Sequence, residues 1–230
     1  MQDTLADTTN PTVDAGTAVQ IDIVSDVMCP WCIVGFRQLE QALAHLNVGA
    51  FVRWHPFELN PDMGPGGQNL AEHIAEKYGS THAQSEANRA RLTELGTSLG
   101  IDFRFSDNSR IVNTFAAHQL LGWAQEHGLQ HPLKMALFDA HFTQALDLSD
   151  REVLLQIAES VGLDKTAAGD VLTSGSHAEA TRKAQTFWTS RGISGVPSMV
   201  FDQRYLLTGA QGAQTYAEML QKVLSERAAA

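Results

Sequence analysis

The chain has 230 residues, of which 43% are hydrophobic and 18% are charged, and its formal net charge is -10 at pH 7. This length and balance are typical of a globular protein with one large domain, or with one domain that carries an inserted second one. A negative net charge argues against nucleic-acid binding, which needs clustered lysine and arginine. No apolar run approaches the roughly 18 residues of a membrane-spanning helix, so we expect no membrane insertion.

The N-terminal segment is rich in Thr, Asp and Ala and shows no hydrophobic periodicity. We predict that residues 1–18 form a disordered leader. The segment has neither the basic start nor the apolar stretch of an ordinary secretory signal. We therefore expect a cytoplasmic protein, and in that compartment a cysteine pair is more often catalytic or metal-binding than structural.

The next segment predicts a strand, a helix and a second strand. Gln20–Val24 is an apolar run, Trp31–Leu46 has helical apolar spacing, and Ala50–Phe57 is rich in aromatic and β-branched residues. From Asn69 to Arg191 the apolar residues recur at helical spacing instead.

After this helical block the pattern returns to short strands. Ser198–Phe201 and Tyr205–Leu207 form a predicted hairpin, and Ala213–Arg227 has the spacing of a terminal amphipathic helix. The order β-α-β, helical block, β-β-α predicts an α/β protein, namely a thioredoxin fold with an inserted all-helical domain. We assign residues 19–64 and 192–230 to the two parts of the thioredoxin domain and residues 65–191 to the insertion.

The most informative motif is the cysteine pair, because Cys29 and Cys32 are the only cysteines in the chain. A Cys-x-x-Cys at a strand-to-helix junction is typical of a thioredoxin-like redox site. The free N–H groups and the positive dipole end of the helix favour a thiolate at Cys29. We predict that Cys29 attacks a substrate disulfide and that Cys32, one turn later, is the buried resolving thiol.

Three residues around the pair are candidate contacts. Pro30 suits the first helical turn, where a missing N–H costs nothing. Trp31 presents a large apolar surface between the thiols, so we expect it to contact a partner. Val196-Pro197 stands directly before the first strand after the insertion. A proline there is usually just a strand-start residue, and its place in the topology favours a role in the site.

A single Cys-x-x-Cys can also form half of a zinc site, or be two inert thiols. Structural zinc needs two further ligands, and the nine histidines of the chain are scattered. His127 and His131 are four apart, but Gly128 and Pro132 interrupt any shared helical face. We therefore predict no metal, and we favour the dithiol interpretation over the inert one.

Several longer stretches carry a family resemblance. They are Ser25–Gly35, Trp54–Pro61, Asn113–Thr114 with Ala117–His118, Asp147–Asp150, Gly192–Pro197 and Gly209–Gln211. Together they cover about residues 19–225 and resemble the DsbA-like oxidoreductases of the FrnE type. The resemblance implies a thioredoxin fold with a helical insertion, a dithiol–disulfide activity, and a cis-proline at Pro197. It also implies that Val196 offers its backbone to an extended substrate.

The chain also departs from that pattern. Thioredoxins and DsbA proteins carry a buried carboxylate on the strand before the cysteines, and here that position is Ile23. Asp26 is a candidate for an electrostatic role near Cys29, or else a loop or helix-capping residue. His118 is a candidate site residue or a core histidine. Gln211, at the start of the last helix, is a candidate polar contact.

We therefore expect an enzyme that oxidises, reduces or isomerises disulfides through a mixed disulfide. Its substrates would be protein or low-molecular-weight disulfides and thiols. It would need no cofactor beyond the Cys29–Cys32 pair, and glutathione is a candidate co-substrate. The direction of electron flow and the oligomeric state do not follow from the sequence.

Two other functions stay open. The superfamily includes 2-hydroxychromene-2-carboxylate isomerases and kappa-class glutathione transferases, which are glutathione-dependent. Those proteins usually carry serine at the first cysteine position, so the intact pair disfavours this alternative. The second alternative is a non-catalytic, chaperone-like protein that binds peptides at the Val196-Pro197 edge.

Overall fold

The computed structural model describes residues 18–229 of the chain. The predicted disordered leader lies outside these residues except for Ala18, which is buried beside the first strand. No helix within residues 18–229 is long and apolar enough to cross a membrane.

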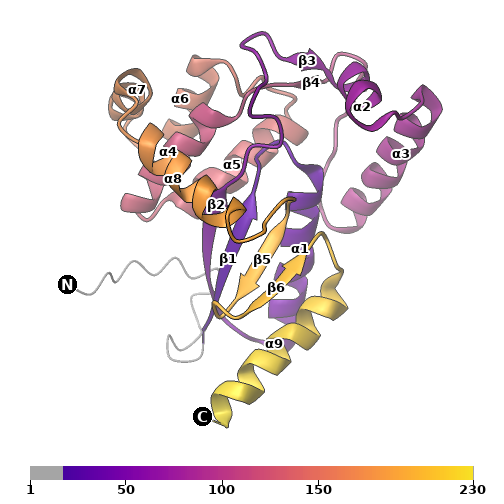
Figure 1. Ribbon diagram of the computed structural model, residues 1–230, viewed down its shortest axis with the longest axis vertical. Coiled ribbons are helices and arrows are strands. Elements are labelled where there is room, and N and C mark those ends of the chain that lie inside the picture. The colour runs from indigo at the N-terminus through magenta and orange to yellow at the C-terminus, as the bar shows by residue number, and fades with distance from the viewer. Residues whose placement is uncertain (1–17, 230) are drawn as a thin grey trace.

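A four-stranded sheet in the order β2-β1-β5-β6 forms the centre of the thioredoxin domain (Figure 1). β1 (Val19–Ser25) pairs in parallel with β2 (Ala50–Pro56) and antiparallel with β5 (Ser198–Phe201). β6 (Tyr205–Thr208) completes the sheet by antiparallel pairing with β5. Every residue of β1 except Gln20 is buried, which explains its continuous apolar run, since an inner strand is covered on both faces.

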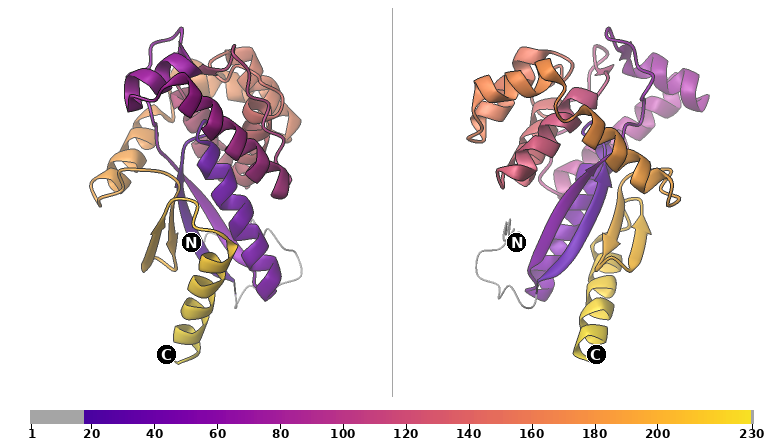
Figure 2. Two further views of the ribbon diagram at one scale, coloured as in Figure 1. Left: turned by 90° about the vertical axis from the view of Figure 1, so that its right-hand side faces the viewer. Right: turned by 60° about the vertical axis from the view of Figure 1, so that its left-hand side comes forward.

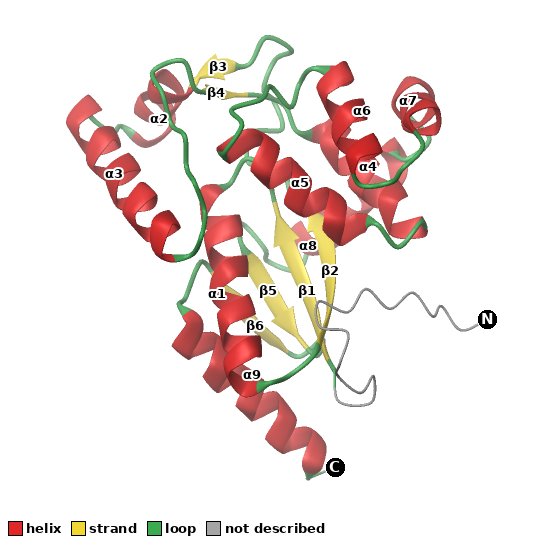
Figure 3. Ribbon diagram, turned by 180° about the vertical axis from the view of Figure 1, so that it is seen from behind, coloured by secondary structure: helices red, strands yellow, loops and turns green. Residues whose placement is uncertain are grey.

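Helices cover both faces of this sheet. α1 (Pro30–Leu46) and α9 (Ala213–Ala228) pack against each other on one face, and α8 (Ala178–Thr189) crosses the opposite face, as Figures 1 and 3 show from opposite sides. α1 starts directly after Cys29 with a proline in its first turn and ends at Asn47, whose left-handed φ of 51° asparagine tolerates well. The strands and the two helices predicted for this domain are thus confirmed.

The segment between β2 and β5 is mainly helical, as predicted (Figure 2). It also contains a short antiparallel ladder, β3–β4, whose two-residue strands are too short to show an alternating pattern in the sequence. In chain order, the elements of this segment that come before α8 are β3 (Gln68–Asn69), α2 (Leu70–Tyr78), α3 (His82–Ser98), β4 (Arg110–Ile111), α4 (Phe115–Glu126), α5 (Gln130–Phe142), α6 (Arg151–Ser160) and α7 (Lys165–Ser174).

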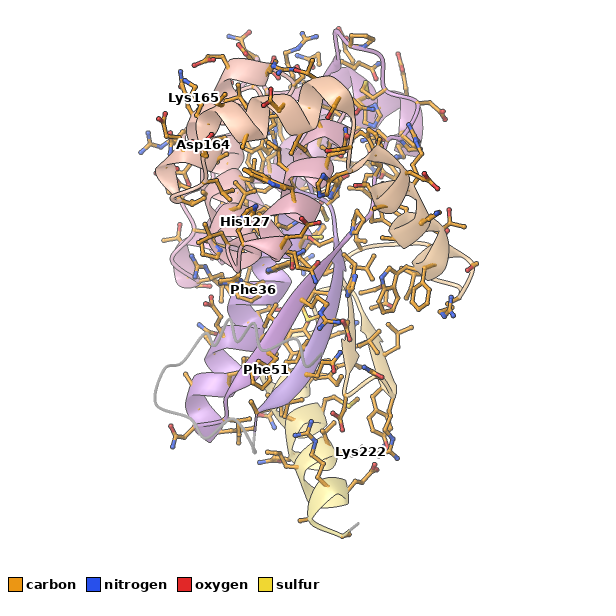
Figure 4. All side chains as sticks on the ribbon, turned by 90° about the vertical axis from the view of Figure 1, so that its left-hand side faces the viewer. Phe36, Phe51, His127, Asp164, Lys165 and Lys222 are labelled. Atoms are coloured by element: carbon orange, nitrogen blue, oxygen red, sulfur yellow. The ribbon has the colours of Figure 1, made fainter. Side chains whose placement is uncertain are left out.

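The domain boundaries predicted at 64/65 and 191/192 fall in the connections between β2 and β3 and between α8 and β5. Figure 4 shows the two parts through labelled side chains. Phe36, Phe51 and Lys222 lie on the thioredoxin domain, and His127 and Asp164 lie on the helical insertion.

Two apolar cores meet at the cysteine motif. The first core lies between the sheet, α1 and α9, includes both Cys29 and Cys32, and extends into the insertion through residues such as Phe138 and Phe142. The second core lies within the helical insertion, and it includes Val27 and Met28 from the loop before the cysteines. The four-residue loop that leads into α1 therefore joins the two parts of the protein, and it does so directly beside the thiols.

Candidate active site

The two cysteines differ in their access to solvent. Cys29 is 4% exposed and lines a large surface cleft, whereas Cys32, one turn inside α1, is 0% exposed and does not line it. Both are free thiols. Cys29 is therefore the sulfur that a bound substrate can reach, which agrees with the order expected from the sequence.

The cysteines lie next to the Val196-Pro197 peptide bond, which is cis, as the family resemblance implied. The sulfur of Cys29 lies 3.7 Å from the carbonyl oxygen of Val196, within reach of a weak S–H···O contact. Gly35, in α1, allows the helix to pack closely against Pro197, because a Cβ at this position would lie 3.1 Å from Cγ of Pro197. The segment before β5 thus contacts the thiol through the Val196 carbonyl and lies against α1 through the ring of Pro197.

The two thiols share a hydrogen bond and act on each other's pKa. The hydrogen bond with Cys32, and then burial, raises the pKa of Cys29 well above its usual value. Burial works to raise the pKa of Cys32, but the hydrogen bond from Cys29 and the positive charge of Lys134 outweigh it and lower that pKa. The thiolate at Cys29 stays a prediction from the end of the helix, and the structure adds the hydrogen bond between the thiols and the charge of Lys134.

Lys134, on α5 of the insertion, is a buried cation near the cysteines that sequence reasoning missed. It is 1% exposed, and its ammonium group lies 4.7 Å from the ring centroid of Phe138 and 5.2 Å from that of Trp54. Burial lowers its pKa to about 8, although the charges of Cys32 and Asp26 act to raise it. The sequence did carry a signal for this residue, because Lys134 is the one lysine in a predicted helical stretch that is otherwise rich in apolar residues.

Asp26 anchors the loop that leads to the cysteines. It is 2% exposed, and its carboxylate accepts N–H groups from Leu59 at 2.8 Å and from Met28 at 3.3 Å. It does not cap α1, because Cys29 occupies the cap position and no side chain bonds to it there. Burial works to raise the pKa of Asp26, and its contacts with His118 and Leu59 lower it, so the carboxylate is ionised.

Of the remaining candidate residues, three lie at or beside the site and one, Gln211, does not. His118 is buried beside the site, where its Nε2 lies 3.0 Å from the carbonyl oxygen of Phe57 and 3.6 Å from Asp26. Trp31, which is 39% exposed, and Pro30 both line the cleft. Gln211 is not brought to the cleft. Its side chain instead donates to the carbonyl of Thr208 in the loop before α9.

The cleft beside Cys29 has a volume of about 660 Å³. Its walls come from the cysteine loop and Val196, from α2 and α3, and from the segments 104–112 and 141–148. Most of the cleft is therefore built by the insertion, while the reactive sulfur comes from the thioredoxin domain. Within residues 18–229 no group of three His, Cys, Asp or Glu side chains is arranged to hold a metal ion.

The sheet order, the helix that starts at Cys29 and the adjacent cis-proline define a protein of the thioredoxin-fold dithiol class. A family model described as a DSBA-like thioredoxin domain matches residues 20–221, so the chain belongs to the DSBA-like thioredoxin domain family. This membership supports thiol–disulfide oxidoreductase chemistry in general terms.

Several known proteins are similar over nearly the whole chain. A probable DsbA oxidoreductase from Streptomyces coelicolor is 30% identical, with a TM-score of 0.85 over 90% of this chain and 91% of that one. An uncharacterised Bacillus subtilis protein, YwbO, is 26% identical over 88% of this chain and 96% of its own. The cytosolic disulfide reductase DsbM from Pseudomonas aeruginosa, solved with GSH, is 17% identical with a TM-score of 0.61, over 90% and 99% of the two chains, and shares the fold.

Proposed function

We propose that this protein is a thiol–disulfide oxidoreductase whose redox centre is the Cys29–Cys32 pair. One observation carries the proposal. Cys29 faces a substrate-sized cleft, while it is hydrogen-bonded to a second thiol that is buried and has a lowered pKa. Two inert core thiols would need neither the cleft nor the neighbouring cation, whereas a dithiol that exchanges with disulfides uses both.

The chemistry starts with a proton transfer inside the pair. Cys32 starts as the thiolate, because its pKa is the lowered one, and it takes the proton of Cys29, so that the negative charge passes to the sulfur that faces the cleft. The Cys29 thiolate attacks one sulfur of the substrate disulfide, and the other substrate sulfur leaves as a thiolate and takes a proton from water. A mixed disulfide between Cys29 and the substrate remains.

Cys32 completes the exchange. It loses its proton and attacks the sulfur of Cys29, and the second substrate thiolate leaves with that proton. The net result is one disulfide in the protein and two product thiols, and the reverse sequence oxidises a dithiol substrate. The positive charge of Lys134 favours the thiolate of Cys32, so it assists this second attack.

Val196, Pro197 and Trp31 form the surface where the reacting part of the substrate would lie. Val196 and Trp31 line the cleft together with Cys29. An extended substrate segment that pairs with the backbone at Val196 would bring its sulfur toward Cys29. We propose substrate binding as the role of Val196 and Trp31, and shaping of the site beside Cys29 as the role of Pro197.

Glutathione is a proposed co-substrate, supported by the shared fold with DsbM, which was solved with GSH. Protein disulfides are the other proposed substrate class. The cytoplasmic location stays a prediction of the sequence, as do the isomerase and chaperone-like alternatives.

Variants of the two cysteines test the proposed function. Cys29→Ser abolishes reduction of insulin and of a small model disulfide, because no nucleophile then faces the cleft. Cys32→Ser still attacks but cannot resolve, so mass spectrometry detects a mixed disulfide at Cys29. Thr208→Ser, a small change outside the cleft, is the control and keeps full activity. Full activity of Cys29→Ser would exclude the proposal.

A further inference from the structure

The cleft beside Cys29 is lined by positive charge, although the protein as a whole is acidic. Arg89 and Arg91 come from α3, and Arg104 and Arg110 come from the segment that follows it. Among the lining residues, Asp147 is the one acidic side chain. A chain with a net charge of -10 thus concentrates four of its arginines on the wall that faces its reactive thiol.

Two of these guanidinium groups are available for a ligand. Arg104 already pairs with Asp102 at 2.8 Å, and Arg110 donates to the carbonyl oxygen of Gly66. Within residues 18–229, the guanidinium groups of Arg89 and Arg91 form no hydrogen bond or ion pair. Arginine binds carboxylate and phosphate groups through paired N–H donors, so unpaired arginines in a cleft favour an anionic occupant.

The rest of the cleft suits a small molecule. Of the five large hydrophobic side chains that are exposed within residues 18–229, Trp31, Tyr78 and Leu146 line it. Its volume of about 660 Å³ lies within the range of small-molecule sites, which is roughly 300–1,000 Å³. The arrangement is therefore an apolar pocket with a few directed charged groups, rather than a flat surface for a folded protein.

We propose that the cleft binds an anionic low-molecular-weight disulfide, and that Arg89 and Arg91 hold its carboxylate or phosphate groups while its sulfur reaches Cys29. This inference rests on the proposed dithiol function and adds the class of substrate. The exchange is the one described above. The small disulfide is reduced to two thiols, and Cys29 and Cys32 are oxidised to a disulfide.

The test measures one turnover, so that no second reductant is needed. The reduced protein is mixed with small disulfides of different charge, and the rate of its oxidation is followed by quenched alkylation of the thiols. Glutathione disulfide supplies carboxylates, coenzyme A disulfide supplies phosphates, hydroxyethyl disulfide is neutral, and cystamine is cationic. We expect both anionic disulfides to react faster than the neutral one and cystamine to react slowest. Added salt should reduce the differences.

Arginine variants then locate the effect. In the Arg89→Gln/Arg91→Gln variant, the ratio of the anionic to the neutral rate constant falls about tenfold, which corresponds to about 1.4 kcal/mol. Arg53→Gln is the matched control, because Arg53 is an exposed arginine of β2 outside the cleft. It also replaces an arginine with glutamine, but outside the cleft, so it should leave the ratio of the two rate constants unaltered.

The outcomes separate the two proposals. A reduced wild-type protein that reacts with no disulfide, insulin included, would overturn the proposed function. A protein that reduces insulin but no small disulfide, or one whose preference for anions survives loss of both arginines, would overturn the inference alone. Preference for one of the two anionic disulfides would support the inference and identify the group that the arginines hold.

Discussion

The positive charge of Lys134, in the helical insertion, acts on the sulfur of Cys32, in the thioredoxin domain. Burial works to raise the pKa of Cys32, and this charge, together with the hydrogen bond from Cys29, lowers it instead. The strand position where related proteins carry a buried carboxylate is occupied here by Ile23, which is fully buried. The insertion therefore places a positive charge that acts on the buried thiol, and it also builds most of the cleft.

Lys134→Met should raise the pKa of Cys32, because it removes the cation while keeping an unbranched apolar stem. The reduced form loses stabilisation, so the equilibrium constant with glutathione shifts on the order of tenfold toward the protein disulfide. The ultraviolet absorbance of the thiolate and a glutathione redox titration measure the two effects. Lys222→Met, an exposed lysine of α9, is the control. An unchanged thiol titration in Lys134→Met would contradict this role.

The same lysine should make stability depend on pH. Burial lowers its pKa from 10.5 to about 8, so between these values the unfolded chain holds a proton that the folded chain has lost. The free energy of unfolding therefore rises with pH in this window. Relative to Lys134→Met, the wild type should gain about 2 kcal/mol between pH 8 and pH 10. Urea unfolding at both pH values tests this. If the free energy of unfolding changed with pH in the same way in both proteins, the prediction would be refuted.

Asp26→Asn should loosen the loop before Cys29. An amide cannot accept both the Leu59 and Met28 N–H groups as the carboxylate does, so we expect a loss of about 1–3 kcal/mol of stability. Disulfide exchange should slow as well, because the loop positions the start of α1. Asp22→Asn is the matched control, since Asp22 is a buried carboxylate that pairs with His55 at 2.7 Å, away from the loop. It should lower the free energy of unfolding and leave the rate of disulfide exchange unchanged.

The pH dependence of Asp26 has a defined sign. Its pKa is lowered in the folded state, so it stabilises the fold above the usual carboxyl pKa of 3.8, and this contribution is lost as the pH falls below that value. Acid unfolding of wild type and Asp26→Asn should therefore converge at low pH. A difference between them that persists in strong acid would argue against an ionised Asp26.

Gly35→Ala should disturb the contact between α1 and Pro197. The new Cβ would lie 3.1 Å from Cγ of Pro197 and 3.3 Å from the hydroxyl oxygen of Tyr216, and both groups are held in the core. We expect a loss of about 1–2 kcal/mol in urea unfolding and slower exchange at Cys29. Gly64→Ala is the control, because nothing lies within 4 Å of a Cβ there. Equal stability of the two variants would show that the site repacks freely.

Much of the site could be predicted from local patterns. The spacing of Cys29 and Cys32 after an apolar strand is a property of a few neighbouring residues, and so are the helices on either side of the insertion. The contact of Pro197 with α1 came from the family resemblance, because no local signal shows which proline reaches the cysteines. The side-chain direction of Gln211 could not be read from the sequence for a related reason. Its position after β6 does not tell whether its side chain turns to the cleft or back to its own loop.

The sequence by itself determined the fold class and the redox pair, since strand and helix periodicity and the Cys-x-x-Cys spacing act over short distances along the chain. Only the tertiary structure decided which sulfur carries the lowered pKa, which carboxylate anchors the loop and which charges line the cleft. Those properties depend on Lys134, Asp26 and Arg89, which come from separate segments. Burial and Coulomb interactions depend on distance in space, and packing of the insertion against the sheet sets those distances.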